Sequence, residues 1–181
     1  ILNKNDIENV NLTEIVNISK DENWVSFSDP STIDRPEDRK SFFENKKLNR
    51  FINLTLKDIN YPNANDWTSW RRTPLSHGYT PLNIINKKNV SNLKLSWSLT
   101  MAEGSNQGTP LVYNGVMFLT HPDNIIQAIN AKNGNLIWEY KYNYKKGSKT
   151  LGGPTRNIAI FKNKIFLATY DAHLIALDAT S

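Results

Sequence analysis

The stretch LVYNGVMFLTHPDNIIQAINAKN, residues 111–133, is matched without gaps by AIFKNKIFLATYDAHLIALDATS, residues 159–181. The two copies place apolar residues at the same positions, as when Met117–Leu119 falls on Ile165–Leu167. Asp123 falls on Asp171 and Ala131 on Ala179 in the same alignment. Because short β-branched runs alternate with turn residues, each copy is predicted to form strand, turn, strand, turn, strand.

The turn residues of the repeat favour tight antiparallel hairpins. Asn114-Gly115 separates the first two predicted strands of the first copy, and Lys162-Asn163 stands at the same place in the second. Asn-Gly is the dipeptide that best suits the turns matching strand twist. Asn133-Gly134 then precedes a fourth predicted strand that includes Trp138. A repeated unit of short antiparallel strands is typical of a β-propeller blade, and we predict an all-β propeller over a sandwich.

The composition divides the chain into two regions. Residues 1–65 are polar and rich in Asn, and we predict a mixed helical and irregular segment with helices over 12–16 and 35–51. Residues 66–181 contain more β-branched and aromatic residues and are predicted to form about two blades. The second copy stops before the Gly and Trp that follow the first, so we expect the N-terminal part of a longer propeller.

Several classes of function are disfavoured by composition. The net charge of +5 is spread over isolated pairs such as Lys87-Lys88, which does not favour a nucleic-acid surface. No cysteine is present to form a disulfide or a thiolate metal site, and no apolar run is long enough to span a membrane. His77, His121 and His173 lack the spacing of metal ligands, and we find no Ser-His-Asp arrangement.

A long stretch before the repeat carries a fixed-spacing pattern. Asp66-Trp67 opens it, Gly78–Leu82 reads Gly-Tyr-Thr-Pro-Leu, and 85–94 reads Ile-Asn-Lys-Lys-Asn-Val-Ser-Asn-Leu-Lys. Pro81 favours extended geometry in the residue before it, and Asn89 is a candidate cap for a short turn. A strand is predicted from the alternating apolar residues Leu93, Leu95, Trp97 and Leu99. We interpret the whole pattern as structural.

This pattern resembles the N-terminal signature of the bacterial quinoprotein alcohol and methanol dehydrogenases. The likeness continues through Gln107–Phe118 and through Ala128–Trp138, which is similar to the family's tryptophan-docking motif. The resemblance implies an eight-bladed propeller that binds pyrroloquinoline quinone (PQQ) with a calcium or lanthanide ion. It also implies an alcohol substrate, a cytochrome c acceptor and a periplasmic location. The family's metal ligands and catalytic base are expected beyond Ser181, so we assign no catalytic residue and no metal ligand here and expect this stretch alone to be inactive.

Two residues match cofactor contacts of that family. Gln107 stands where several members have a Glu that bonds the quinone, and its amide can both donate and accept. Arg156 matches the family Arg that approaches the cofactor, and its charged fork suits a carboxylate. The alternatives are an ordinary polar residue at a strand start for Gln107 and a salt bridge for Arg156.

The loop Thr150–Thr155 is the main departure from the family. Many members have two adjacent cysteines there that stack on the quinone, whereas this chain has Gly152-Gly153 nearby. Glycines let a backbone approach a ring closely, but the loop also suits a simple connection. Two other functions stay open: a non-catalytic propeller scaffold of the cell envelope, and a separate partner-binding module in residues 1–65.

Overall fold

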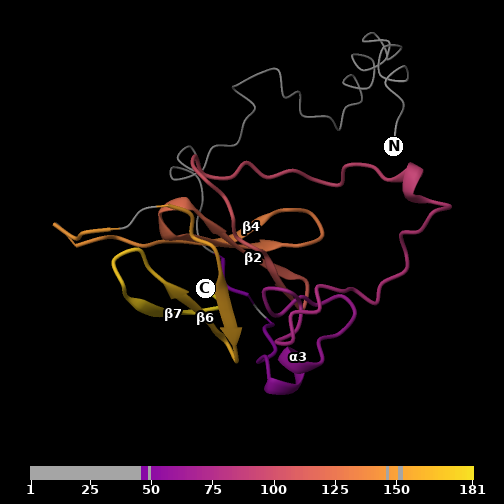
Figure 1. The fold of residues 1–181 in the computed structure, drawn as a ribbon, viewed down its shortest axis with the longest axis horizontal. Coiled ribbons are helices and arrows are strands. Elements are labelled where there is room, and N and C mark those ends of the chain that lie inside the picture. The colour runs from indigo at the N-terminus through magenta and orange to yellow at the C-terminus, as the bar shows by residue number, and fades with distance from the viewer. Residues whose placement is uncertain (1–45, 49, 146, 151–152) are drawn as a thin grey trace, which may run out of the picture.

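The computed structural model describes residues 46–48, 50–145, 147–150 and 153–181, which contain two antiparallel sheets. The first sheet has the order β1-β2-β3-β4 and the second β5-β6-β7, so neighbours in sequence are neighbours in space (Figure 1). The bounds are β1 Leu111–Tyr113, β2 Val116–His121, β3 Ile125–Asn130, β4 Leu136–Lys141, β5 Ile158–Phe161, β6 Lys164–Ala168 and β7 Leu174–Asp178. This arrangement confirms the predicted all-β blades.

The internal repeat is confirmed down to the strand register. Leu111 pairs with Phe118 in the first sheet, and the matching residues Ala159 and Phe166 pair in the second. The turn at Asn114 and Gly115 has φ angles of 50° and 77°, the left-handed geometry that Asn and Gly accept most easily. The sequence repeat therefore corresponds to a repeated hydrogen-bonded hairpin, not only to a repeated hydrophobic pattern.

Among the described residues, one hydrophobic core joins the two sheets. Phe118 and Trp138 from the first sheet pack with Ile165 and Leu167 from the second, and all four are at most 1% exposed. Burying a side chain of this size contributes about 1.5–3 kcal/mol. Leu54, fully buried, enters the same core from outside the repeat through a two-way backbone pairing with Lys162.

Two tryptophans make equivalent contacts in the two copies. The indole Nε1 of Trp138 donates to the carbonyl of Ala179 at 3.1 Å, and Nε1 of Trp97 donates to the carbonyl of Ala131 at 3.2 Å. Ala131 and Ala179 occupy the same place in the repeat. The Trp97 ring also covers Gly134 so closely that an added β-carbon would lie 2.7 Å from it. These contacts attach each indole to the turn after the third strand of a copy.

The predicted strand over residues 93–99 is wrong. Trp97 is held by its side chain, but this segment has no strand partner among the residues that the structure describes. A strand needs a neighbouring ladder to satisfy its backbone groups, and alternation alone does not supply one. The segment belongs instead to a long extended arm, drawn in magenta and pink, that loops out from the sheets and returns to them (Figure 1).

Asn89 precedes the 3₁₀ turn Val90–Asn92 on this arm, but its side chain does not cap that turn. It accepts from the backbone N–H of Asn86 at 2.8 Å and donates to the carbonyl of Ile84 at 2.7 Å. The predicted capping role is therefore wrong, because the amide stabilises the loop before the turn.

The described part of the first region lies against both sheets. The backbone N–H of Lys46 donates to Ile137 and that of Leu48 to Thr180, each at 2.8 Å. A short helix, α3 (Leu56–Asn60), begins with a reciprocal capping box between Thr55 and Asp58. The helix predicted over 12–16 and most of that over 35–51 lie outside the described residues, and 46–48 and 50–51 are not helical. The boundary at residue 65 stays a prediction.

The Asp66-Trp67 pair has a structural position. Asp66 is 7% exposed, and its carboxylate accepts from the backbone N–H of Asn114 at 3.0 Å. The backbone of Trp67 exchanges two hydrogen bonds with Val112 of β1, at 2.7 and 2.8 Å. The pair thus ties the chain before the repeat to the first hairpin and its turn.

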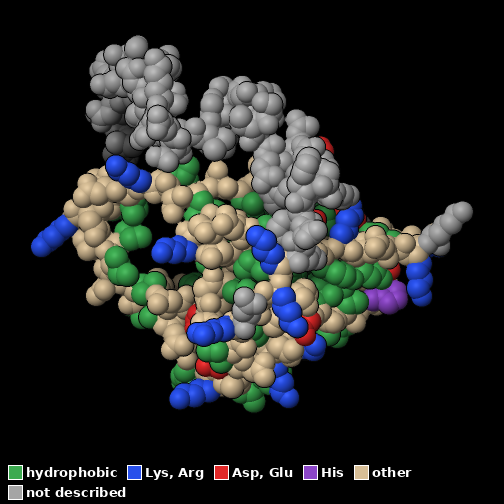
Figure 2. Space-filling view, turned by 180° about the vertical axis from the view of Figure 1, so that it is seen from behind, with side chains coloured by type: hydrophobic (Ala, Val, Ile, Leu, Met, Phe, Trp, Pro, Cys, Tyr) green, Lys and Arg blue, Asp and Glu red, His purple; other side chains and the backbone are tan. Residues whose placement is uncertain are grey.

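On the face drawn in Figure 2, charged side chains do not gather in one place. In the view of Figure 2 the Lys and Arg side chains are scattered singly over the surface. Within the described residues no helix is long and apolar enough to cross a membrane.

Candidate functional site

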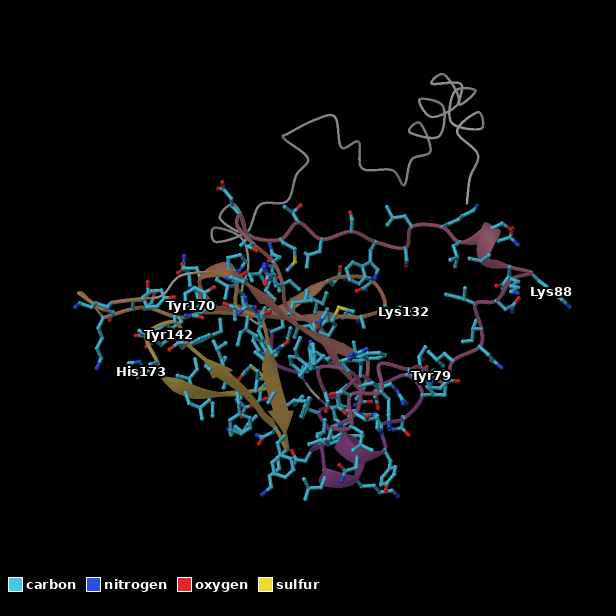
Figure 3. The ribbon with its side chains drawn as sticks, viewed as in Figure 1. Tyr79, Lys88, Lys132, Tyr142, Tyr170 and His173 are labelled. Carbon is cyan, nitrogen blue, oxygen red and sulfur yellow. The ribbon has the colours of Figure 1, made fainter. Side chains whose placement is uncertain are left out.

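The candidate residues come together at one end of the two sheets. β2 leads into β3 at this end through the turn Pro122–Asn124, and β6 leads into β7 through 169–173. The antiparallel order also brings the start of β1 and the start of β5 to this end, because these strands pair with β2 and β6. Tyr142, Tyr170 and His173 lie there together, far from Tyr79 and Lys88 on the arm (Figure 3).

Gln107 and Arg156, the two predicted cofactor residues, are in direct contact. Nε of Arg156 donates to Oε1 of Gln107 at 3.1 Å, although the residues are 49 apart in sequence. The Gln107 amide donates in turn to the Ser105 hydroxyl at 3.2 Å. Both side chains are exposed, and no carboxylate of the described residues forms an ion pair with Arg156. The guanidinium charge is therefore uncompensated within the described part of the chain.

The backbone beside Gln107 is packed too tightly for any residue but glycine. A β-carbon on Gly108 would lie 2.0 Å from Oγ1 of Thr120 and 3.2 Å from the carbonyl oxygen of Arg156. That Thr120 hydroxyl donates to the carbonyl of Thr155 at 3.0 Å in a buried position. The end of β2 therefore connects the segments that carry Gln107 and Arg156 and sets the distance between them.

An open cavity of about 480 Å³ lies at the same end of the sheets, although neither Gln107 nor Arg156 is among the residues that line it. Its lining includes Gly104, Ser105, Asp123, Tyr144, Thr150 and Tyr170, which come from both copies of the repeat and from the loops before them. Ser105 links the cavity to Gln107 through the hydrogen bond already described. The wall is rich in hydroxyl groups and aromatic rings and contains one carboxylate.

The structure describes one of the two glycines predicted to approach the quinone ring. Gly153 lines the cavity with a φ of 96°, a backbone conformation that glycine adopts readily, and no atom lies within 4 Å of where its β-carbon would be. Gly152 lies outside the described residues. The described side of the loop thus offers backbone to the cavity at this position.

A hydroxyl network supports the cavity wall from below. Asn124, fully buried, donates from Nδ2 to the Tyr144 hydroxyl at 2.7 Å, and its backbone N–H donates to Oγ1 of Thr155 at 3.2 Å. Thr155 also bonds the Tyr170 hydroxyl at 3.1 Å. Because Thr155 precedes Arg156, the same network that orients the two tyrosines fixes the start of β5.

The Tyr144 hydroxyl stays protonated over the physiological range. Burial, followed by the neighbouring Asp123 carboxylate, raises the pKa of Tyr144 to about 12. Asp123 itself adopts a positive φ of 65° and lies 3.7 Å from the ammonium of Lys141. Tyr144 can therefore donate a hydrogen bond but does not serve as an anion near neutral pH.

Sequence reasoning missed the cavity and its supporting network. Asn124 and Thr155 carry no motif, and their roles depend on contacts between segments 31 residues apart. The Tyr-rich run Tyr140-Lys141-Tyr142-Asn143-Tyr144 was the available signal, since aromatic residues continue beyond the end of β4. Within the described residues no group of three or more His, Cys, Asp or Glu is placed to hold a metal ion.

The chain is similar to known quinone-dependent dehydrogenases. A family model described as "Glucose/ethanol/alcohol dehydrogenase, beta-propeller domain" matches residues 67–181. The dehydrogenase subunit of the quinone alcohol dehydrogenase of Gluconacetobacter polyoxogenes is 37% identical over 118 residues, covering 63% of this chain and 16% of that protein.

Two solved structures share the fold. The quinohemoprotein alcohol dehydrogenase ADHIIG of Pseudomonas putida HK5 superposes with a TM-score of 0.64 at 29% identity, covering 73% of this chain and 20% of that one. A europium-containing methanol dehydrogenase gives a TM-score of 0.59 at 29% identity, covering 65% and 22%. The chain spans about a fifth or less of the length of these relatives. Because the family model matches residues 67–181, more than half of the chain, the chain belongs to the PQQ-dependent β-propeller family of glucose, ethanol and alcohol dehydrogenases.

Proposed function

We propose that this chain is the N-terminal part of a PQQ-dependent dehydrogenase that oxidises a primary alcohol and passes the electrons to a cytochrome c. The observation that carries the proposal is the contact between Arg156 and Gln107, which unites two residues that match family cofactor positions. A periplasmic location belongs to the same proposal.

The residues present fit a planar ligand that bears several carboxylates. Arg156 offers guanidinium donors beyond the Nε–H that Gln107 accepts, and no described carboxylate neutralises its charge. Tyr144 and Tyr170 add aromatic surface and hydroxyl groups to the cavity wall, and Thr155, the residue before Arg156, bonds the Tyr170 hydroxyl. The combination of an uncompensated cation, amide groups and aromatic surface is suited to an acidic quinone.

Within this site each residue has a distinct part. Arg156 would bind a cofactor carboxylate, and Gln107 would hold the guanidinium in orientation by accepting its Nε–H. When bound, the quinone supplies the capacity to accept two electrons from the alcohol, while the protein supplies binding and electrostatics. No ligand for the calcium or lanthanide ion and no base for the hydroxyl proton is assigned to the described residues. The europium-containing relative supports a lanthanide as the alternative to calcium.

The test is a titration of the full-length protein with PQQ in the presence of calcium or a lanthanide. We expect saturable cofactor binding and alcohol-dependent reduction of a dye. In the same assay Arg156→Ala should weaken PQQ binding by about 10- to 100-fold, because a hydrogen bond to a charged group contributes about 1.5–3 kcal/mol. Arg50→Ala, which removes an exposed arginine elsewhere on the chain, serves as the matched control and should bind like the wild type.

Arg156→Lys tests how the cofactor is recognised. Lysine keeps the charge but not the planar fork, so intermediate binding would support recognition of a carboxylate by the fork. Absence of PQQ binding by the wild-type protein with either metal would refute the proposal. That outcome would favour the second candidate, a non-catalytic propeller scaffold.

A further inference from the structure

His121 is a fully buried histidine at the end of β2, directly beneath the segment that leads to Gln107. Its Nδ1 accepts the backbone N–H of Ala102 at 3.0 Å. Its Nε2 lies 2.9 Å from Oε1 of Gln127, another fully buried residue on the adjacent strand β3.

The neighbours of His121 determine which nitrogen carries the proton. Gln127 donates from Nε2 to a carboxylate oxygen of Glu139 at 2.6 Å, so its Oε1 faces His121 as an acceptor. His121 Nε2 must then be the donor, and Nδ1 is left as the acceptor that the Ala102 N–H requires. The contacts with Ala102 and with Gln127 therefore require the same neutral tautomer, in which Nε2 carries the proton and Nδ1 accepts from the Ala102 N–H.

The segment that Ala102 begins is closed by few other contacts. Asn106 donates from Nδ2 to the carbonyls of Ala102 at 3.1 Å and Gly104 at 3.3 Å, which folds the loop 102–107 upon itself. At its far end Gly108 is wedged against Thr120. Thr120 and His121 are consecutive residues, so the last two positions of β2 hold both ends of the loop that presents Ser105 and Gln107.

We propose that His121 is a positioning residue that fixes the 102–107 loop, and with it Gln107, for cofactor binding. The inference rests on the proposed function in assigning Gln107 to the cofactor. The anchoring of the loop itself does not depend on that assignment, because it consists of contacts within the cofactor-free chain.

Two substitutions separate the contacts of His121. Asparagine places an amide oxygen near the position of Nδ1, so His121→Asn keeps an acceptor for Ala102 and loses the donor to Gln127. Glutamine places an amide nitrogen near the position of Nε2, so His121→Gln does the reverse. His77→Gln is the control, since His77 is an exposed histidine before the repeat, with its Nδ1 3.1 Å from the Thr73 hydroxyl.

The first readout is amide hydrogen exchange on the full-length protein without cofactor. In the wild type the Ala102 amide should exchange more slowly than those of Gly104 and Ser105, for which no acceptor is found among the described residues. His121→Gln should speed exchange at Ala102 by about fivefold to tenfold, the equivalent of one lost hydrogen bond, while His121→Asn should not. A wild-type Ala102 amide as fast as its neighbours overturns the inference even if neither variant folds.

The second readout is PQQ binding by the same proteins. We expect His121→Gln to weaken binding by about fivefold to tenfold and His121→Asn to restore it toward the wild type at equal thermal stability. Equal binding by both variants, with wild-type binding intact, overturns the positioning role while leaving the proposed function in place. If the wild type binds no PQQ, the proposed function fails, and the assignment of the loop to the cofactor fails with it.

Discussion

Replacement of Gly108 by alanine tests the packing that sets the distance between Gln107 and Arg156. The added methyl group would lie 2.0 Å from Oγ1 of Thr120, well inside any tolerated contact, and 3.2 Å from the Arg156 carbonyl. Relief requires the Thr120 hydroxyl to move, which also breaks its 3.0 Å bond to the Thr155 carbonyl. Overpacking costs about 1–3 kcal/mol and the buried unpaired carbonyl about 1–3 kcal/mol more. We expect Gly108→Ala to lower the free energy of unfolding by about 3 kcal/mol.

A double-mutant cycle tests whether the cost of Gly108→Ala comes from the clash with the Thr120 hydroxyl. Thr120→Ala alone should cost about 1–2 kcal/mol through the lost hydrogen bond. The double variant should cost about as much as Thr120→Ala, because the hydroxyl that clashes is gone and the same bond cannot be lost twice. The nearest atoms to the new methyl would then be the Arg156 carbonyl at 3.2 Å and Cβ of residue 120 at 3.4 Å.

The assay is urea unfolding of the full-length apo-protein, followed by tryptophan fluorescence, with PQQ binding measured in parallel. Gly115→Ala is the control, because no atom lies within 4 Å of its added methyl but its φ of 77° strains an alanine by about 1 kcal/mol. Thr120→Ala should not relieve that strain. Strictly additive losses for Gly108→Ala and Thr120→Ala would refute the reasoning.

Two further predictions concern stability. Trp138→Phe should lower the free energy of unfolding by about 2–4 kcal/mol, since it shrinks a buried ring and leaves the Ala179 carbonyl without its donor. Trp97→Phe, at a partly exposed site, should lower it by less. Thermal unfolding that ranks the two variants in the opposite order would contradict this. The Thr169 hydroxyl, which donates to the Asp171 carboxylate, is the main cause that lowers the pKa of Asp171 below its usual 3.8. The ionised carboxylate therefore stabilises the fold above about pH 4, and this stabilisation is lost as the pH falls through the lowered pKa. The melting temperature of Thr169→Val should therefore fall less between pH 7 and pH 3 than that of the wild type or of Thr169→Ser. An equal fall in all three proteins would contradict this.

The repeated hairpins could be predicted from sequence because their determinants are local. Alternating apolar residues specify which face of a strand is buried, and a turn such as Asn114-Gly115 sets the register of the strands that it joins. The same local reasoning failed at residues 93–99. There the alternation was real, but a strand also needs a neighbour, and Trp97 is held by its indole instead.

The candidate site was predictable only in part. Gln107 and Arg156 were found by resemblance, and the structure adds that they touch. The buried anchors His121, Asn124 and Thr155 were not found as parts of the site. Each is an ordinary polar residue in sequence, and its role arises from a partner that the fold brings near.

Residue order alone was enough to predict the hairpin repeat, its turns and the family, since these depend on local patterns and short-range geometry. Tertiary structure alone decided the 3.1 Å contact between Arg156 and Gln107, the cavity at the same end of the sheets and the tautomer of His121. The physical reason is that a hydrogen bond depends on distance and direction, and for residues far apart in the chain these are set only when the sheets pack.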